Sequence, residues 1–276
     1  MRRTKFFISV LFVLIAPEIA YPEYGAIPES SIDPAVIKID EDKYLGAKIS
    51  GDYIFLDEKG EEFKMGDIMG KPIIILLSYY SCNGLCPTAN KKLKDVITGL
   101  NRFKAGEDYR IITLSFDKED DILRMRMFTD MAGLRGLTGD SWRIVVMKNK
   151  DEIENLTGSV GFKFFWSSRD KMFLHPNVFI FISPEGRVVR YLYGTSLNVR
   201  EVELAITEAI WEQSASSNSK VADLISMACY SYNFKEGKYT VNYPIVIGFG
   251  SLLLGISFIS IPLLVLRKRK RKEGGI

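Results

Sequence analysis

Two cysteines four residues apart are the clearest candidates for chemistry in this chain. Cys82 and Cys86 flank Gly84 in the stretch YSCNGLCP, residues 80–87. We expect this stretch to join a buried strand to a helix, and sites in α/β proteins form in such loops. Because the N–H groups at a helix start favour a thiolate, at least Cys86 should have a depressed pKa. A static disulfide and a pair of buried, inert thiols are the alternatives, although so short a bridge would restrain the unfolded chain little.

The third candidate is His175, which is the only histidine of the chain and stands directly before Pro176. If its segment returns beside the cysteine loop, two thiolates and one imidazole converge. Such a soft set of three suits Cu(I) better than tetrahedral zinc, and Cu(II) would need a further oxygen ligand. A catalytic Cys-His pair for peptide hydrolysis and an ordinary surface or core histidine are the rival interpretations. Two cysteines so close would readily oxidise, which argues against the hydrolase.

Composition excludes several other classes of protein. The chain has 276 residues, of which 47% are hydrophobic and 26% charged, as in a globular protein. Three cysteines and one histidine are too few for a disulfide-stapled scaffold, a four-thiolate zinc site or an H-E-x-x-H metalloprotease. The net charge is +3, but the first residues carry +3 and the tail from Arg267 carries +5, which leaves about −5 between them. No nucleic-acid partner is therefore predicted.

The two ends predict export and a membrane anchor. Basic residues precede an apolar run from Phe6 to Ala16, which is the layout of a secretory signal peptide. Pro244 to Leu266 contains no charge and is followed by six basic residues, so we expect a single span, a cytoplasmic C-terminus and a working domain on the outer, periplasmic face of the cytoplasmic membrane. The expected organisation is a signal peptide at 1–20, a polar lead at 21–44, a domain at 45–212, a linker and juxtamembrane segment at 213–243, a transmembrane helix at 244–266 and a basic tail at 267–276.

Hydrophobic patterns predict the elements that position these residues. We expect a hairpin over 53–64, buried strands over 73–80 and 110–116, helices from Pro87 and over 119–132, and a short helix over 151–156. A second hairpin joins 177–182 to 187–193 through the turn SPEG, and a helix over 199–211 covers it. The order β-α-β-α-β-β-α is that of a thioredoxin-like α/β fold, a central mixed sheet with helices on both faces.

With these motifs in place, the chain resembles the SCO/SenC family. The resemblance rests on Cys82-x-x-x-Cys86-Pro87 after an apolar strand, on SFD at 115–117, and on His175 before SPEGR at 183–187. It implies a membrane-tethered, thioredoxin-like copper-binding protein that helps to assemble the dinuclear copper centre of cytochrome c oxidase. Cys82, Cys86 and His175 would be its copper ligands. Further pieces, among them CYSY at 229–232, resemble the subgroup anchored by a C-terminal helix.

The leading hypothesis is thus a copper chaperone that passes copper to the copper-site subunit of cytochrome c oxidase. A periplasmic copper donor or a thiol reductant is the further partner that we consider. The alternative is a thiol-disulfide oxidoreductase in which Cys82 and Cys86 cycle as a redox dithiol and reduce a copper-site apoprotein. A peroxide-reducing enzyme is a weaker third reading. Asp117 is followed by Lys118 at a position where the family often has proline. Cys229, the third cysteine, could form a disulfide between two chains or have no chemical role.

Overall fold

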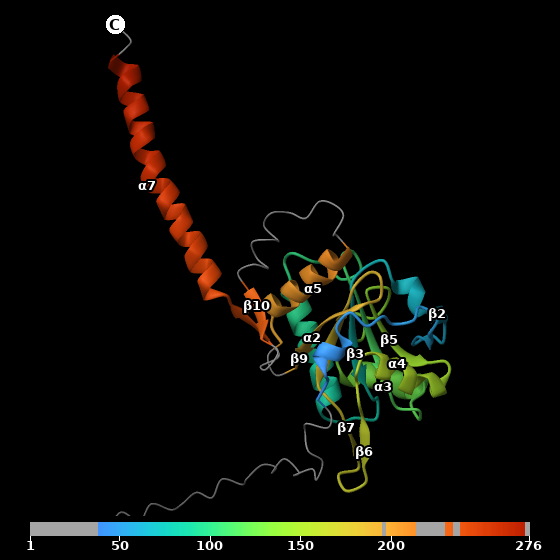
Figure 1. Cartoon of the computed structure of the whole chain (residues 1–276). Coiled ribbons are helices and arrows are strands. Elements are labelled where there is room, and N and C mark those ends of the chain that lie inside the picture. The colour runs from blue at the N-terminus through green and yellow to red at the C-terminus, as the bar shows by residue number, and fades with distance from the viewer. Residues whose placement is uncertain (1–37, 195–196, 214–229, 234–237, 274–276) are drawn as a thin grey trace, which may run out of the picture.

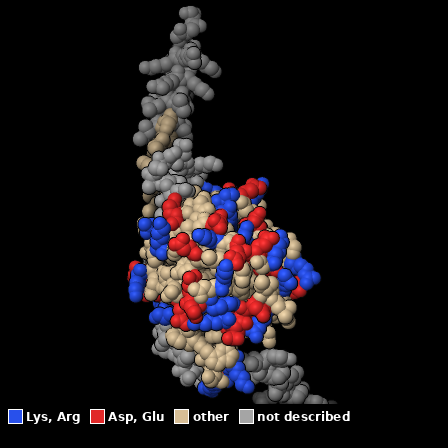
Figure 2. Space-filling model, turned by 90° about the vertical axis from the view of Figure 1, so that its right-hand side faces the viewer, with Lys and Arg blue, Asp and Glu red and all other residues tan. Residues whose placement is uncertain are grey.

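The computed structural model describes residues 38–194, 197–213, 230–233 and 238–273. The expected signal peptide, most of the polar lead and Cys229 lie outside these residues. Lysine and arginine are interspersed with aspartate and glutamate over the face shown in Figure 2.

A seven-stranded mixed sheet forms the centre of the molecule, in the order β2-β1-β5-β4-β3-β8-β9 (Figure 1). Strands β3, β4 and β5 run parallel, and the remaining neighbours pair antiparallel. The central strands are runs of apolar, largely β-branched residues, and β3 is buried along its whole length, as expected for a strand covered on both faces. The bounds are β1 Ile54–Leu56, β2 Glu62–Lys64, β3 Ile73–Ser78, β4 Arg110–Ser115, β5 Trp142–Met147, β8 Val178–Ile182 and β9 Val188–Tyr193.

Helices cover the sheet. Helix α5 packs against α2 and against strands β8 and β9, while α3 packs against β5. The bounds are α1 Glu41–Tyr44, η2 Met65–Ile68, α2 Leu85–Thr98, α3 Ile122–Met131, η3 Lys150–Glu152, α4 Ile153–Ser159 and α5 Val199–Gln213. The thioredoxin-like arrangement of a mixed sheet and covering helices is confirmed.

Three details differ from the sequence prediction. Helix α2 starts at Leu85 after an N-cap at Gly84, so Pro87 lies within the first turn rather than at its start. The helix predicted over 119–132 is shorter in the structure, where α3 runs from Ile122 to Met131; its Met125 and Phe128 are buried, whereas Leu123 and Met127 are 66% and 63% exposed. Strand β5 was not predicted, because its apolar run IVVM is too short for periodicity to separate strand from helix.

Two small hairpins were also not predicted. Strands β6 (Phe165–Ser167) and β7 (Met172–Leu174) pair directly before His175. Strands β10 (Tyr230–Asn233) and β11 (Lys238–Val241) pair within the segment expected to be a linker. The guanidinium of Arg190 lies 5.6 Å from the ring centroid of Tyr239, so β11 packs on the domain.

Helix α7 (Tyr243–Glu273) follows the second of these hairpins. Crossing a bilayer takes about 20 consecutive, predominantly apolar helical residues. Among the residues that the structure describes, no helix has the length and apolar character needed for this. The transmembrane helix expected at 244–266 is therefore not supported.

Candidate metal centre

The cysteine loop connects the end of β3 to the start of α2. The N–H of Cys82 donates to the carbonyl of Tyr79 at 3.3 Å, and the N–H of Gly84 donates to the Cys82 sulfur at 3.5 Å. Cys82 and Cys86 are unbridged and only 5% and 3% exposed, although the residues between them are exposed. The loop thus turns both thiols inward and leaves its backbone at the surface.

The two thiols share one negative charge unequally. A hydrogen bond from the Cys86 thiol, together with the N–H groups of Cys86 and Gly84, outweighs burial and lowers the pKa of Cys82 to about 5. The same hydrogen bond and burial raise the pKa of Cys86. The prediction that Cys86 carries the depressed pKa is therefore wrong, because the amides at the helix start are directed at the sulfur of Cys82.

His175 follows β7 and turns its ring toward the cysteines. Its Nε2 lies 3.7 Å from the Cys86 sulfur, and its Nδ1 lies 3.0 Å from the carbonyl oxygen of Pro176. A proton on Nδ1 satisfies that carbonyl and leaves the lone pair of Nε2 facing Cys86. Burial lowers the pKa of His175, so the imidazole is neutral at pH 7, which is the form that binds metals.

Aromatic rings fix the orientation of this imidazole. The ring centroid of His175 lies 5.1 Å from that of Phe116, 5.8 Å from Phe162 and 5.9 Å from Tyr79. The Tyr79 hydroxyl is also hydrogen-bonded to the Cys82 sulfur, and burial raises the pKa of that phenol. Sequence reasoning missed Tyr79, since an aromatic residue at a strand end is usually a core residue.

The separation of Cys86 and His175 fits a shared metal ion. Ligand bonds of about 2.3 Å to sulfur and 2.0 Å to nitrogen, opened to the 120° angle of a three-coordinate ion, place the two atoms about 3.7 Å apart. The sulfur and Nε2 are 3.7 Å apart. No group of three or more His, Cys, Asp and Glu side chains within the described residues is already arranged to hold an ion, so Cys82 would have to move to complete the set.

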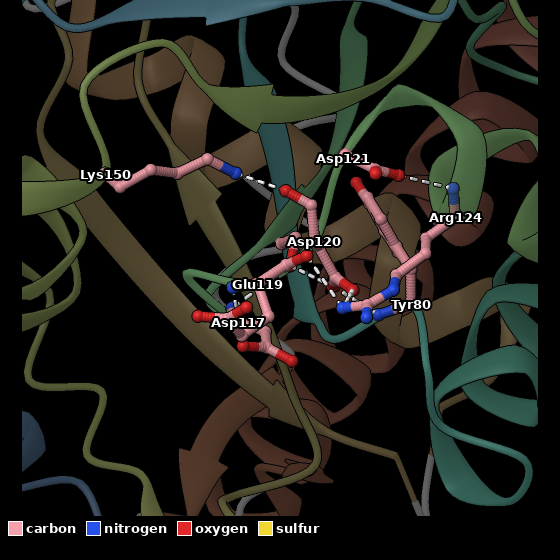
Figure 3. A network of polar contacts seen from close by, with 8 residues as sticks. Tyr80, Asp117, Glu119, Asp120, Asp121, Arg124 and Lys150 are labelled. Carbon is pink, nitrogen blue, oxygen red and sulfur yellow. Dashed lines mark hydrogen bonds and ion pairs between the residues drawn. The ribbon is translucent and has the colours of Figure 1, made fainter.

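The buried carboxylate of Asp120 binds the backbone just before the cysteine loop, at Tyr80 (Figure 3). Asp120 is 1% exposed and accepts hydrogen bonds from the N–H of Tyr80 at 2.6 Å and the hydroxyl of Ser115 at 2.5 Å. Asp117 accepts from the N–H of Glu119 at 3.0 Å, within its own segment. The run DKEDD at 117–121 is typical of a solvated acidic stretch, so no sequence pattern indicated a role for Asp120.

Comparison with known proteins places this arrangement in a family. The family model SCO1/SenC matches residues 41–210, more than half of the chain. The chain belongs to the SCO1/SenC family. A solved structure from Aquifex aeolicus VF5, provisionally described as an electron transfer protein, is 31% identical over 63% of this chain and 99% of that one, with a TM-score of 0.56.

Two further relatives carry Sco names. An SCO2-like protein of Rickettsia felis is 25% identical over 156 residues, which are 53% of this chain and 70% of the relative. Arabidopsis thaliana ScoI was solved with copper bound and is 19% identical over 59% of this chain and 99% of that one, with a TM-score of 0.47. Homologous Sco structures thus contain copper. The subgroup with a C-terminal membrane anchor, which the sequence suggested, is not supported by these comparisons.

Proposed function

We propose that this SCO1/SenC protein is a copper chaperone, with Cys82, Cys86 and His175 as copper ligands, that supplies the dinuclear copper centre of cytochrome c oxidase. The observation that carries the proposal is the 3.7 Å separation between the Cys86 sulfur and Nε2 of His175, which suits two ligands of one ion. A Sco relative is described as belonging to a family of cytochrome c oxidase assembly proteins, which supports the recipient.

The proposed cargo matches the donor chemistry. Two thiolates and a neutral imidazole are soft to intermediate ligands, which favour Cu(I). Binding displaces the proton that Cys86 donates to Cys82, so loading requires the reduced pair and releases a proton. Cu(II) would require an added oxygen ligand. Copper leaves by ligand exchange, in which each bond from this site is replaced by one from the recipient.

The test is an anaerobic titration of the reduced full-length chain with Cu(I) against a competing chelator. One copper per chain is expected, and affinity should fall at least tenfold in His175→Ala. Leu123→Ala, which removes an exposed side chain of α3, is the matched control. Binding that is negligible, or unaffected by the loss of His175, contradicts the three-ligand model.

A thiol-disulfide oxidoreductase is the second candidate, and the unequal thiol pKa values favour it. The Cys82 thiolate would attack a substrate disulfide and form a mixed disulfide, which Cys86 then resolves as it gives up its proton. The two cysteines end as a disulfide, and the substrate leaves with two thiols. Metal-free turnover of a disulfide substrate, abolished by Cys82→Ser and unchanged by His175→Ala, would support this candidate.

Attachment to the cytoplasmic membrane, with the domain on the outer, periplasmic face and the tail 267–276 in the cytoplasm, is a further proposal. It is supported by the sequence, in which an uncharged run over 244–266 precedes six basic residues. Protease added outside spheroplasts should then digest the domain and spare the tail. Recovery of the chain in the supernatant after an alkaline wash would refute the anchor.

A further inference from the structure

The β6–β7 hairpin exposes large aromatic side chains beside the cysteine loop. Phe165 is 39% exposed and Trp166 is 54% exposed. The hairpin projects from the body of the domain in Figure 1. Because Phe165 and Trp166 are consecutive in β6, their rings lie on opposite faces of the hairpin. Exposed aromatic rings on one projecting element mark an interaction site more often than an isolated apolar residue does.

Direct contacts connect these rings to the thiolate. The Trp166 and Phe173 ring centroids are 5.1 Å apart, and those of Phe173 and Tyr79 are 5.2 Å apart. The Tyr79 hydroxyl is hydrogen-bonded to Cys82, and His175 directly follows β7. A molecule that packs on Trp166 is therefore separated from Cys82 by two ring contacts and one hydrogen bond.

A groove lies at the base of the hairpin. Its volume is 260 Å³, and it is bordered by Thr157 of α4, by Phe162, Phe164 and Phe165, and by the charged residues Glu154 and Lys163. The ring of Phe162 also contacts that of His175, at 5.8 Å between centroids. The groove thus has an apolar wall for a single side chain and is one ring contact away from the candidate ligand His175.

The charge of the hairpin differs in sign from that of the body. Lys163, just before β6, and Arg169 and Lys171, in the turn between β6 and β7, are exposed, and the carboxylate of Asp170 accepts a hydrogen bond from the Ser167 hydroxyl at 2.7 Å. Figure 2 shows mostly uncharged side chains, edged by basic ones, at the lower end of the molecule, where the hairpin projects in Figure 1. A basic rim around an apolar patch is complementary to an acidic rim on a partner.

We propose that this basic aromatic tip, formed by Phe165, Trp166, Lys163, Arg169 and Lys171, docks the protein that exchanges copper with the site. The partner presents an apolar side chain to the groove, acidic residues to the basic rim, and its thiols to Cys82 and Cys86. This inference rests on the proposed function. In the exchange, thiolates of the partner replace those of this site on an unchanged Cu(I), and a proton from the partner returns to Cys86.

The experiment follows copper transfer from the Cu(I)-loaded full-length chain, in detergent, to the soluble copper-site domain of the same organism's oxidase. Phe165→Ser/Trp166→Ser should slow transfer at least tenfold at low acceptor concentration. Lys163→Glu/Lys171→Glu should slow it several-fold at low salt, with the difference disappearing at high salt. The matched control is Leu123→Ser/Met127→Ser, which removes two similarly exposed side chains of α3 and should leave the rate unchanged.

Copper affinity is measured for each variant by chelator competition and should stay within twofold of the wild-type value. This measurement separates a loss of docking from damage to the copper site. If the wild-type chain transfers copper and both tip variants transfer it as fast, the docking surface is refuted and the proposed function stands. If the wild-type chain binds copper but transfers none, the chaperone function and the docking that rests on it both fail. Binding of anionic lipid vesicles or self-association that depends on the tip, with unchanged transfer, would assign the surface to a membrane or a second copy and overturn the proposal.

Discussion

Replacing Asp120 separates its two roles, as a hydrogen-bond acceptor and as a buried charge. The carboxylate accepts from Tyr80, two residues before Cys82, and from Ser115 at the end of β4. Asp120→Ala leaves both buried donors without this acceptor. Since an orphaned buried donor costs about 1–3 kcal/mol, and the Ser115 hydroxyl can rotate, the expected loss of stability is about 2–4 kcal/mol.

Asp120→Asn keeps an oxygen acceptor but removes the charge. Burial is the main cause that raises the pKa of Asp120, and the charge of Asp117 adds to it, whereas the hydrogen bonds from Ser115 and Tyr80 and the ion pair with Arg124 at 3.8 Å act in the opposite direction. A raised native pKa means that this group stabilises the fold fully below its unfolded pKa, and that this contribution is lost as pH rises through the native pKa. Stability of the wild type relative to Asp120→Asn should therefore fall as pH increases from about 4 toward neutrality.

Urea unfolding of the reduced, metal-free chain, followed by tryptophan fluorescence at several pH values, measures both effects. Asp140→Asn is the control, because that carboxylate is 94% exposed in its ion pair with Arg143 and should matter little. Equal losses for Asp120→Ala and Asp120→Asn would show that the acceptor oxygen is unimportant. A difference between the wild type and Asp120→Asn that does not vary with pH would refute the raised pKa.

Three further predictions concern the thiols and one close contact. The alkylation rate of Cys82, measured by mass spectrometry against pH, should have a midpoint near pH 5, and Cys86→Ala should move it toward the ordinary value of 9.0 because the leading hydrogen bond is lost. An unmoved midpoint would contradict the shared charge. Tyr79→Phe should raise the midpoint by less than Cys86→Ala does, since its hydrogen bond is the weakest of the lowering contacts; a larger shift would reverse that ranking. Gly161→Ala should cost about 2–4 kcal/mol in urea unfolding, because φ is +69° and the new Cβ would lie 2.5 Å from the Tyr44 ring. Gly136→Ala, with φ of +79° and no atom within 4 Å, is the control and should cost only about 1–2 kcal/mol.

The sequence was sufficient for most of the central sheet, although not for β5, and for the contact between Cys86 and His175. Long apolar runs such as residues 73–78 identify buried strands, and the SPEG turn identifies the β8–β9 hairpin. The pairing of Cys86 with His175 followed from the expected order of elements. These features depend on local patterns and on a topology with few alternatives.

What could not be predicted depends on contacts between distant segments. Cys82 is the thiolate because the N–H groups at the start of α2 are directed at its sulfur. The spacing of the two cysteines does not determine which sulfur these N–H groups reach. The sequence around Asp120 is typical of an exposed stretch, and only the fold brings its carboxylate to the N–H of Tyr80. The β6–β7 hairpin consists of two three-residue strands, which are too short to leave a period-2 pattern.

Copper binding and thiol exchange use the same two sulfurs, and this makes them exclusive states of one site. Copper binding requires both cysteines as thiolates, so the proton of Cys86 must leave. A disulfide between the same two sulfurs leaves no thiolate to bind copper. His175 distinguishes the two states, because its nitrogen can ligate an ion but takes no part in disulfide exchange. A chain whose His175→Ala variant loses copper and retains exchange would therefore possess both chemistries, with the oxidation state of the pair deciding which one a docked partner meets.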